Sequence, residues 1–267
     1  MGLDVTPNSD PVVMRALTAF SQFMFILFPV LLLSYLQGNN FKDTFKIKKP
    51  NLSILLLSIL GIFLIQPAIE GFMHFQNKLI YSLPLGDEFF NALEQFESLF
   101  EELTLSLVTA HSIPELIGVI LVIAVTPAIC EEFFFRGLVL KNFERSFTAV
   151  PAIVYTGILF AIFHFHPLNI IPLALLGYYL SFIAYYSGSL YTSITAHFIN
   201  NLFAVLALYY IGAESFDRST IGTGDDLQIG LMGIGSLILF IIILKAIRKI
   251  ALKTNSTSQT TPFNKDE

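Results

Sequence analysis

The chain alternates long apolar stretches with short polar segments, and this alternation predicts its secondary structure. About seven stretches reach the roughly 20 mostly apolar residues that a helix needs to cross a bilayer. We expect these helices over Val13–Gln37, Leu52–Met73, Ile113–Leu140, Ala149–His166, Leu168–Ser187, Leu190–Ile211 and Leu227–Ile247. Ser187-Gly188-Ser189 interrupts the apolar pattern between the fifth and sixth stretches. The pattern therefore predicts an all-α, polytopic integral membrane helix bundle.

The segment His74–Ser112 has a different pattern, in which apolar residues recur every three or four positions with glutamates between them. The apolar positions are Phe89, Phe90, Leu93, Phe96, Leu99, Phe100 and Leu103. This spacing predicts an amphipathic helix. We expect this helix on the outer membrane surface; a lid packed over the bundle is the second, alternative placement.

Composition supports a membrane protein rather than a soluble globule. Hydrophobic residues make up 54% of the chain, charged residues make up 13%, and the mean hydropathy is +0.70. The single cysteine, Cys130, excludes an intrachain disulfide and a cysteine-based zinc site. No nucleic-acid-binding signature is present. We expect one transmembrane domain over residues 1–253, in contact with the lipid bilayer, and a polar, disordered tail over residues 254–267.

Charged residues outside the apolar stretches predict the orientation of the chain. Basic residues follow the first, third and seventh stretches: Lys42, Lys46, Lys48, Lys49, Lys141, Arg145, Lys245, Arg248, Lys249 and Lys253. Acidic residues fill two alternate loops: Asp87, Glu88, Glu94, Glu97, Glu101, Glu102, Glu214, Asp217, Asp225 and Asp226. Because basic loops stay in the cytoplasm, we expect the N-terminus outside and the C-terminus inside.

The third stretch carries Glu131-Glu132-Phe133-Phe134-Phe135-Arg136, which places three ionisable groups in apolar sequence. A charge near the bilayer centre costs roughly 2.5–3.5 kcal/mol on insertion scales. On a helix, Glu132 and Arg136 lie four residues apart on one face and can pair. Glu131 lies about 100° around the helix and remains available for another role. A purely structural ion pair, with Glu131 reaching an interface, is the alternative interpretation.

Two further stretches carry histidines: His164 in the fourth, and His197 in the sixth with Asn201 one turn later. At a rise of about 1.5 Å per residue from the expected cytoplasmic ends, Glu131 lies about 15 Å deep, His164 about 20 Å and His197 about 13 Å. These depths are near the middle of a hydrocarbon core roughly 30 Å thick. We therefore expect the groups to meet in a cavity inside the membrane, because intramembrane ionisable groups usually line one.

A carboxylate beside neutral imidazoles can take a proton from water. Asn201 and a histidine can stabilise the oxyanion that forms when this water attacks a carbonyl group. Alternatively, Glu131, His164 and His197 can be the ligands of a zinc ion, although the chain has no His-Glu-x-x-His helix. A proton-coupled transporter and a non-catalytic immunity or scaffold protein are the other function classes that the pattern leaves open.

The motifs Glu131-Glu132…Arg136, Phe160…His164 and His197…Asn201 occur in this order, and together they resemble the CAAX protease and bacteriocin-processing (CPBP) family of intramembrane endopeptidases. The resemblance covers about residues 113–210. It implies that Glu131 activates water, that Glu132 and Arg136 order Glu131, and that His164 and His197 position the water or a metal. It also implies that Asn201 helps to bind the oxyanion. The family is described as one of metalloproteases, and a metal-free, glutamate-driven reaction is also argued for it.

The resemblance also implies a partner and a location. The expected substrate is a hydrophobic or membrane-associated peptide or a membrane protein. Eukaryotic relatives cleave after a prenylated cysteine, and several bacterial relatives are linked to bacteriocin immunity or peptide processing. We expect a multi-pass protein of the cell membrane, of the bacterial inner-membrane type, with a site that opens toward the cytoplasm.

Overall fold

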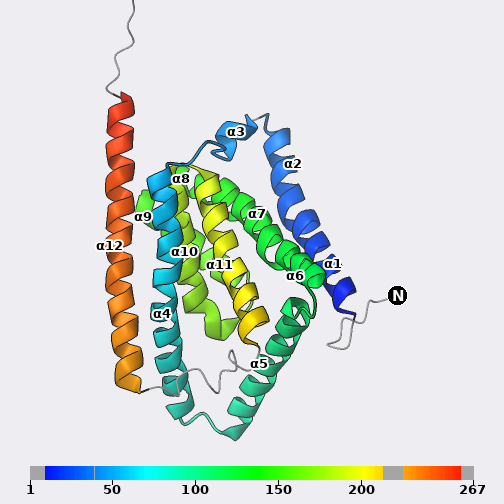
Figure 1. Cartoon of the computed structure of the whole chain (residues 1–267). Coiled ribbons are helices and arrows are strands. Elements are labelled where there is room, and N and C mark those ends of the chain that lie inside the picture. The colour runs from blue at the N-terminus through cyan, green and yellow to red at the C-terminus, as the bar shows by residue number, and fades with distance from the viewer. Residues whose placement is uncertain (1–9, 39, 213–224, 260–267) are drawn as a thin grey trace, which may run out of the picture.

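The computed structural model describes residues 10–38, 40–212 and 225–259, with side chains as far as Thr254. Within these ranges the secondary structure is helical and contains no strand. The elements are α1 (Pro11–Ser21), η1 (Gln22–Leu27), α2 (Phe28–Leu36), α3 (Phe41–Thr44), α4 (Leu52–Ser82), α5 (Asp87–Val108), α6 (Ile113–Val119), η2 (Ile120–Val125), α7 (Thr126–Glu132), η3 (Phe133–Val139), α8 (Leu140–Ser146), α9 (Ala149–Ile162), η4 (Pro167–Asn169), α10 (Ile170–Ser187), α11 (Leu190–Ile211) and α12 (Asp226–Gln259). Figure 1 shows their arrangement.

Six helices in the described part of the chain are long and apolar enough to cross a membrane. They are Pro11–Leu36, Leu52–Ser82, Ile113–Ser146, Pro167–Ser187, Leu190–Ile211 and Asp226–Thr254. The first contains the π-helical segment η1, and the third contains the π-helical segments η2 and η3. The prediction of an all-α, multi-pass helix bundle is therefore confirmed.

The fourth expected span is shorter than the sequence pattern predicts. We expected a helix over Ala149–His166, but α9 ends at Ile162 after 14 residues. The proline ring of Pro167 disfavours helical backbone at the residue before it, and His166 is extended with φ −115° and ψ 93°. A helix of this length covers only about 21 Å. His164 therefore lies in the turn between α9 and α10, not on a helix as predicted.

Helix α10 occupies the centre of the bundle, where small residues let its neighbours approach closely. The Tyr179 hydroxyl is buried and donates a hydrogen bond of 2.7 Å to the Ser58 carbonyl of α4. Any side chain at Gly61 would collide with this hydroxyl. On the opposite side, Gly157 of α9 meets Gly177 of α10, and a Cβ at Gly177 would lie 2.9 Å from the Gly157 oxygen. These contacts fix the position of α10 along its axis relative to α4 and α9.

The outer helices flank this centre on two sides. In Figure 1, α12 runs along α4 at one edge of the bundle, and α1 and α2 lie at the other edge. The glycines Gly71 and Gly233 allow α4 and α12 to pack closely, because a Cβ at Gly71 would lie 3.6 Å from the Gly233 Cα. Helix α12 continues to Gln259, six residues into the segment expected to be a tail, and residues 260–267 lie outside the described ranges.

The predicted amphipathic helix is α5, and it packs against the bundle. The buried Arg15 of α1 donates hydrogen bonds to the carbonyls of Leu107 and Thr109 at the end of α5 and forms an ion pair of 2.9 Å with Glu115 of α6. Val108 also packs against the cluster formed by Leu116, Val119 and Val205. These contacts favour the second placement, a helix that covers the bundle.

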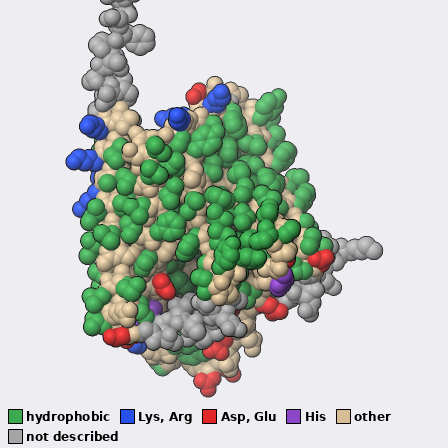
Figure 2. Space-filling view, viewed as in Figure 1, with side chains coloured by type: hydrophobic (Ala, Val, Ile, Leu, Met, Phe, Trp, Pro, Cys, Tyr) green, Lys and Arg blue, Asp and Glu red, His purple; other side chains and the backbone are tan. Residues whose placement is uncertain are grey.

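Charged side chains gather at the two ends of the molecule (Figure 2). In that view most of the visible lysines and arginines lie toward the upper end, the end of α3, α8 and the last turns of α12, and most visible carboxylates lie at the lower end near α5. Hydrophobic side chains cover the surface between the two ends. Two expected members of the acidic set, Glu214 and Asp217, lie outside the described residues.

This separation of charge leads to a prediction about topology. In intact cells, a cysteine at the exposed position Glu102 should react with an impermeant thiol reagent added from outside, whereas a cysteine at the exposed position Lys49 should react only after permeabilisation. The unmodified chain is the control, because its single cysteine, Cys130, is buried. The reverse labelling pattern would show that the acidic end faces the cytoplasm.

Candidate active site

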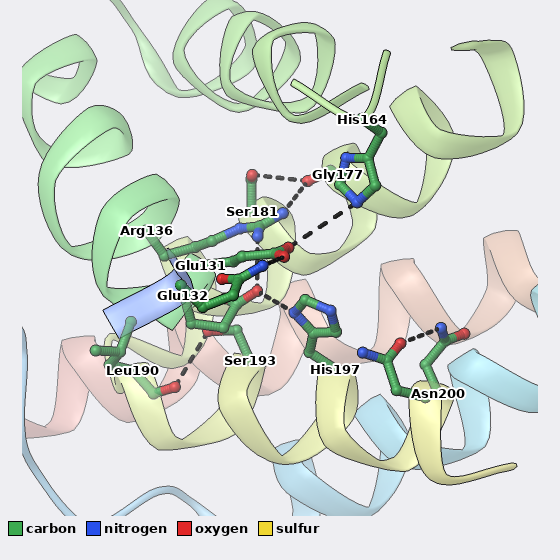
Figure 3. A network of polar contacts seen from close by, with 12 residues as sticks. Glu131, Glu132, Arg136, His164, Gly177, Ser181, Leu190, Ser193, His197 and Asn200 are labelled. Atoms are coloured by element: carbon green, nitrogen blue, oxygen red, sulfur yellow. Dashed lines mark hydrogen bonds and ion pairs between the residues drawn. The ribbon is translucent and has the colours of Figure 1, made fainter. Parts of the chain in front are cut away.

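The buried ion pair between Glu132 and Arg136 forms the base of the candidate site (Figure 3). Glu132 Oε1 accepts a hydrogen bond of 2.6 Å from Arg136 Nη1 and one of 2.9 Å from His197 Nδ1. The side chains of Glu132 and Arg136 have no exposed surface, and that of His197 is 4% exposed. Because a carboxylate oxygen only accepts, His197 Nδ1 carries the hydrogen. The pairing predicted from the spacing of four residues is present, and it also orients a histidine from another helix.

Arg136 is held on three sides. Its Nη2 donates a hydrogen bond of 2.9 Å to the Gly177 carbonyl of α10, which also accepts one of 2.7 Å from the Ser181 hydroxyl. The guanidinium lies 4.8 Å from the ring centre of Phe160 on α9, within the range of a cation–π contact. Arg136 thus joins three parts of the bundle, α9, α10 and η3, around Glu132.

Glu131 points away from this pair and toward two other segments. Its Oε1 accepts a hydrogen bond of 3.1 Å from Gln22 Nε2 in η1. Its Oε2 lies 4.0 Å from His164 Nε2 and is buried, with no hydrogen-bond donor among the described residues. An ionised carboxylate oxygen in such a place requires a donor. Glu131 Oε2 therefore faces His164 at a distance too long for a hydrogen bond, and it has room for a donor between the two side chains.

His164 is oriented by the backbone of the helix before it. Its Nδ1 lies 2.7 Å from the Phe160 carbonyl, which can only accept, so Nδ1 donates. In the neutral imidazole, Nε2 is then an acceptor that faces Glu131. The chain leaves the helical conformation just after His164, where Phe165 adopts φ 50°. Phe160 therefore orients His164 in two ways: its carbonyl accepts the hydrogen bond from Nδ1, and its ring lies 4.5 Å from the imidazole ring.

Asn201 is fixed by a row of amides that crosses three helices. Gln66 of α4 donates to Asn200 over 2.9 Å, Asn200 donates to Asn201 Oδ1 over 3.1 Å, and Asn201 Nδ2 donates to the Ile123 carbonyl over 3.2 Å. An amide nitrogen has two hydrogens, so the bond to Ile123 leaves one for a substrate oxygen. Ile123 lies in the π-helical segment η2, a departure from α geometry that is frequent at functional sites.

The structure brings the predicted residues into two neighbouring groups. Glu132, Arg136 and His197 form one hydrogen-bonded set, and Glu131 with His164 forms the other. Asn201 lies one helical turn after His197 on α11. Three members were missed from the sequence: Gln22, Gln66 and Asn200. A polar amide inside an apolar span needs a hydrogen-bond partner. Gln22 and Gln66 lie in the first two apolar spans, so their positions could have indicated from the sequence that they contact other polar groups.

The three side chains predicted as zinc ligands are not arranged as a metal site. Within the described residues, no group of three or more histidines, cysteines, aspartates or glutamates is placed to hold a metal ion. Two ligands of a tetrahedral zinc ion lie about 3.3 Å apart, but Glu131 Oε2 and His164 Nε2 are separated by 4.0 Å. His197 is bonded to Glu132 and has no contact with Glu131 that would complete a set.

A cavity of about 600 Å³ adjoins the site on the side of α5. Its lining includes Asn201 and Ile123, which form the hydrogen bond described above, and His166, which follows His164 by two residues. Carboxylates and apolar side chains of α5 form the opposite wall. The cavity therefore lies at the acidic end of the bundle, whereas we expected from the sequence a site that opens at the basic end.

The buried ion pair gives a prediction about stability. Arg136→Ala leaves Glu132 buried without its main counter-charge, which typically costs about 3–5 kcal/mol. We expect a clearly lower unfolding temperature in detergent, measured with a fluorogenic thiol reagent that reaches the buried Cys130 only on unfolding. Glu144→Ala is the matched control, because it breaks a partly exposed pair with Lys46 and should have a much smaller effect. Equal unfolding temperatures for Arg136→Ala and the unmodified chain would refute the role of the pair.

Comparison with known proteins identifies the segment that carries the site. Residues 113–203 match the family model described as type II CAAX prenyl endopeptidase Rce1-like. This segment contains Glu131, Glu132, Arg136, His164, His197 and Asn201. No curated protein and no solved structure matches the chain. Over residues 113–203, about a third of its length, the chain is therefore similar to the Rce1-like type II CAAX prenyl endopeptidases, a family of membrane proteases.

Proposed function

We propose that the protein is an endopeptidase that hydrolyses a peptide bond of a hydrophobic or membrane-associated substrate with water activated by Glu131. The observation that carries this proposal is the pair of facing acceptors, Glu131 Oε2 and His164 Nε2, 4.0 Å apart in a buried site. The family supports a CAAX-type protease. The mechanism and the substrate are our own inference.

The two acceptors are spaced to hold one water molecule. A water oxygen about 2.8 Å from each of two acceptors that are 4.0 Å apart subtends an angle of about 90°, close to its own H–O–H angle. Such a water donates one hydrogen to Glu131 and the other to His164. Its lone pairs then point away from both side chains, toward a substrate carbonyl.

In the reaction, Glu131 takes a proton from this water while the water oxygen attacks the carbonyl carbon of the peptide. The carbonyl oxygen becomes an oxyanion, and the remaining amide hydrogen of Asn201 can donate to it. When the carbon–nitrogen bond breaks, the proton held by Glu131 passes to the leaving amine. One carboxylic acid and one amine result, and no covalent enzyme intermediate is required.

The second group, Glu132 with Arg136 and His197, orients side chains of the site and does not contact the attacking water. The hydrogen bond from Nδ1 to Glu132 directs His197 Nε2 away from the ion pair. A carboxylate that fixes one imidazole nitrogen sets the tautomer and orientation of the ring. We infer that His197 supports the oxyanion side of the site, next to Asn201 on the same face of α11.

We also propose the location. The family and the apolar helices support a multi-pass membrane protein, and we place it in the cell membrane, of the bacterial inner-membrane type, with the basic end in the cytoplasm. A prenylated peptide and an unmodified hydrophobic peptide both remain within the proposed substrate class.

The role of Glu131 can be tested with the isosteric variant Glu131→Gln. Glutamine keeps the size and one hydrogen-bond acceptor but cannot take the proton, so peptide cleavage should fall by roughly 10²–10⁴-fold with an unchanged unfolding temperature. Wild-type activity should persist in the presence of a zinc chelator if water is activated by Glu131 alone. Loss of activity on chelation with recovery on added zinc would replace this mechanism by a metal-dependent one, and full activity of Glu131→Gln would exclude both.

Gln22 gives a separate prediction, because it lies outside the segment matched by the family model. Gln22→Ala removes the hydrogen bond to Glu131 Oε1, and a bond to a charged group is worth about 1.5–3 kcal/mol. We expect kcat to fall roughly tenfold or more, with KM unchanged, in a peptide-cleavage assay. Ser21→Ala is the matched control, since the Ser21 hydroxyl bonds only within its own helix, to Thr18. A drop in both variants would indicate a general effect of the first span.

A further inference from the structure

The cavity beside the site meets all three segments that carry the reacting groups. Asn201 lies on its wall, one turn from His197. His166 on its wall is two residues from His164, and Ile123 is eight residues before Glu131. At a rise of about 1.5 Å per residue, Ile123 lies about 12 Å from Glu131 along the helix. The cavity therefore approaches the reacting groups from one direction, the acidic end.

Helix α5 turns carboxylates into this cavity. Glu94, Glu97 and Glu101 follow one another at intervals of three and four residues, and all three belong to the lining. They therefore share one face of α5 over about 10 Å. Phe96 and Phe100 hold this face in place, because their rings lie 6.4 Å and 5.3 Å from the ring of His166.

The α11 side of the cavity carries apolar residues beside Asn201, among them Val205 and Leu208. Val108 at the end of α5 is also part of the lining and packs near Val205. None of the described lining residues is a lysine or an arginine. A helix that merely lies on a membrane surface keeps its charged face in the water, whereas α5 directs part of that face at a cavity next to the site. Nor are these carboxylates grouped to hold a metal ion, within the described residues.

We propose that this cavity receives the part of a peptide substrate that flanks the scissile bond, and that this part carries lysine or arginine beside apolar residues. Complementary charge is the basis for this choice of occupant: an acidic wall attracts a cation, and the apolar wall buries the neighbouring side chains. This inference rests on the proposed function, because it takes Glu131 as the point of cleavage. It narrows the substrate from a hydrophobic peptide to a cationic, amphipathic one.

Binding can be tested apart from catalysis with the Glu131→Gln variant in nanodiscs of phosphatidylcholine, a lipid without net charge. The probes are two fluorescent peptides with the same apolar core, one ending in Lys-Lys and the other in Gln-Gln, measured by fluorescence anisotropy. An exposed ion pair contributes at most about fivefold, and the peptide can form two such pairs, so we expect the lysine peptide to bind about tenfold more tightly. High salt should remove this advantage, because the carboxylates Glu94 and Glu101 are exposed.

The same advantage should disappear in Glu94→Gln/Glu101→Gln and persist in the control Glu88→Gln/Glu102→Gln, which removes two exposed charges of α5 that are not in the lining. Equal binding of the two peptides, or an equal loss in both double variants, would overturn the inference. Cleavage by the unmodified chain separates the two proposals. Equal KM for both peptides contradicts only the charge preference, whereas selective binding of the lysine peptide without any cleavage contradicts only the proposed function.

Discussion

The structure depends on the neutralisation of two charges at a place where water does not reach. Glu132 and Arg136 have no exposed side-chain surface, and either one alone would be strongly unfavourable there. The pair is stable because each partner has further bonds: His197 donates to Glu132, and Arg136 donates to Gly177. These partners come from α10 and α11, which must therefore keep a fixed axial position relative to η3. The close approach of Gly157 and Gly177 and the buried hydroxyl of Tyr179 hold α10 in that position.

Around this fixed pair, the groups with a proposed role in the reaction are held by weaker and more local bonds. Glu131 is held by one amide from the first span, and His164 is held by one carbonyl in the turn after α9. Asn201 depends on amides from α4 and α11 and on a carbonyl in η2. Gln22 and Gln66 lie outside residues 113–203, so the segment that defines the family does not contain all the bonds that orient its site. The first two spans therefore contribute hydrogen bonds to the candidate site, in addition to packing.

The sequence predicted the class of fold and the Glu132–Arg136 ion pair correctly, but it did not predict the contacts between helices. Apolar length gave the long helices, and the spacing of Glu132 and Arg136 gave their ion pair, because both follow from helix geometry alone. The early end of α9 was missed because it depends on the backbone around His166-Pro167, which a hydrophobicity pattern does not reveal. The contacts of Gln22 and of Asn200 were missed because they join helices far apart in the chain. Such contacts depend on how the helices pack, and periodicity describes only one helix at a time.

The distribution of charge connects the topology to the way a substrate reaches the site. Basic side chains are concentrated at one end, where lysines and arginines interact favourably with anionic lipid headgroups. At the other end, the carboxylates of α5 line the cavity beside Asn201, where an anionic headgroup would be repelled. The cationic peptide proposed above would be attracted to this end, with its apolar residues between α5 and α11. The amphipathic character of α5 would then serve two purposes: its apolar residues pack the helix against the bundle, and its carboxylates favour a cationic substrate.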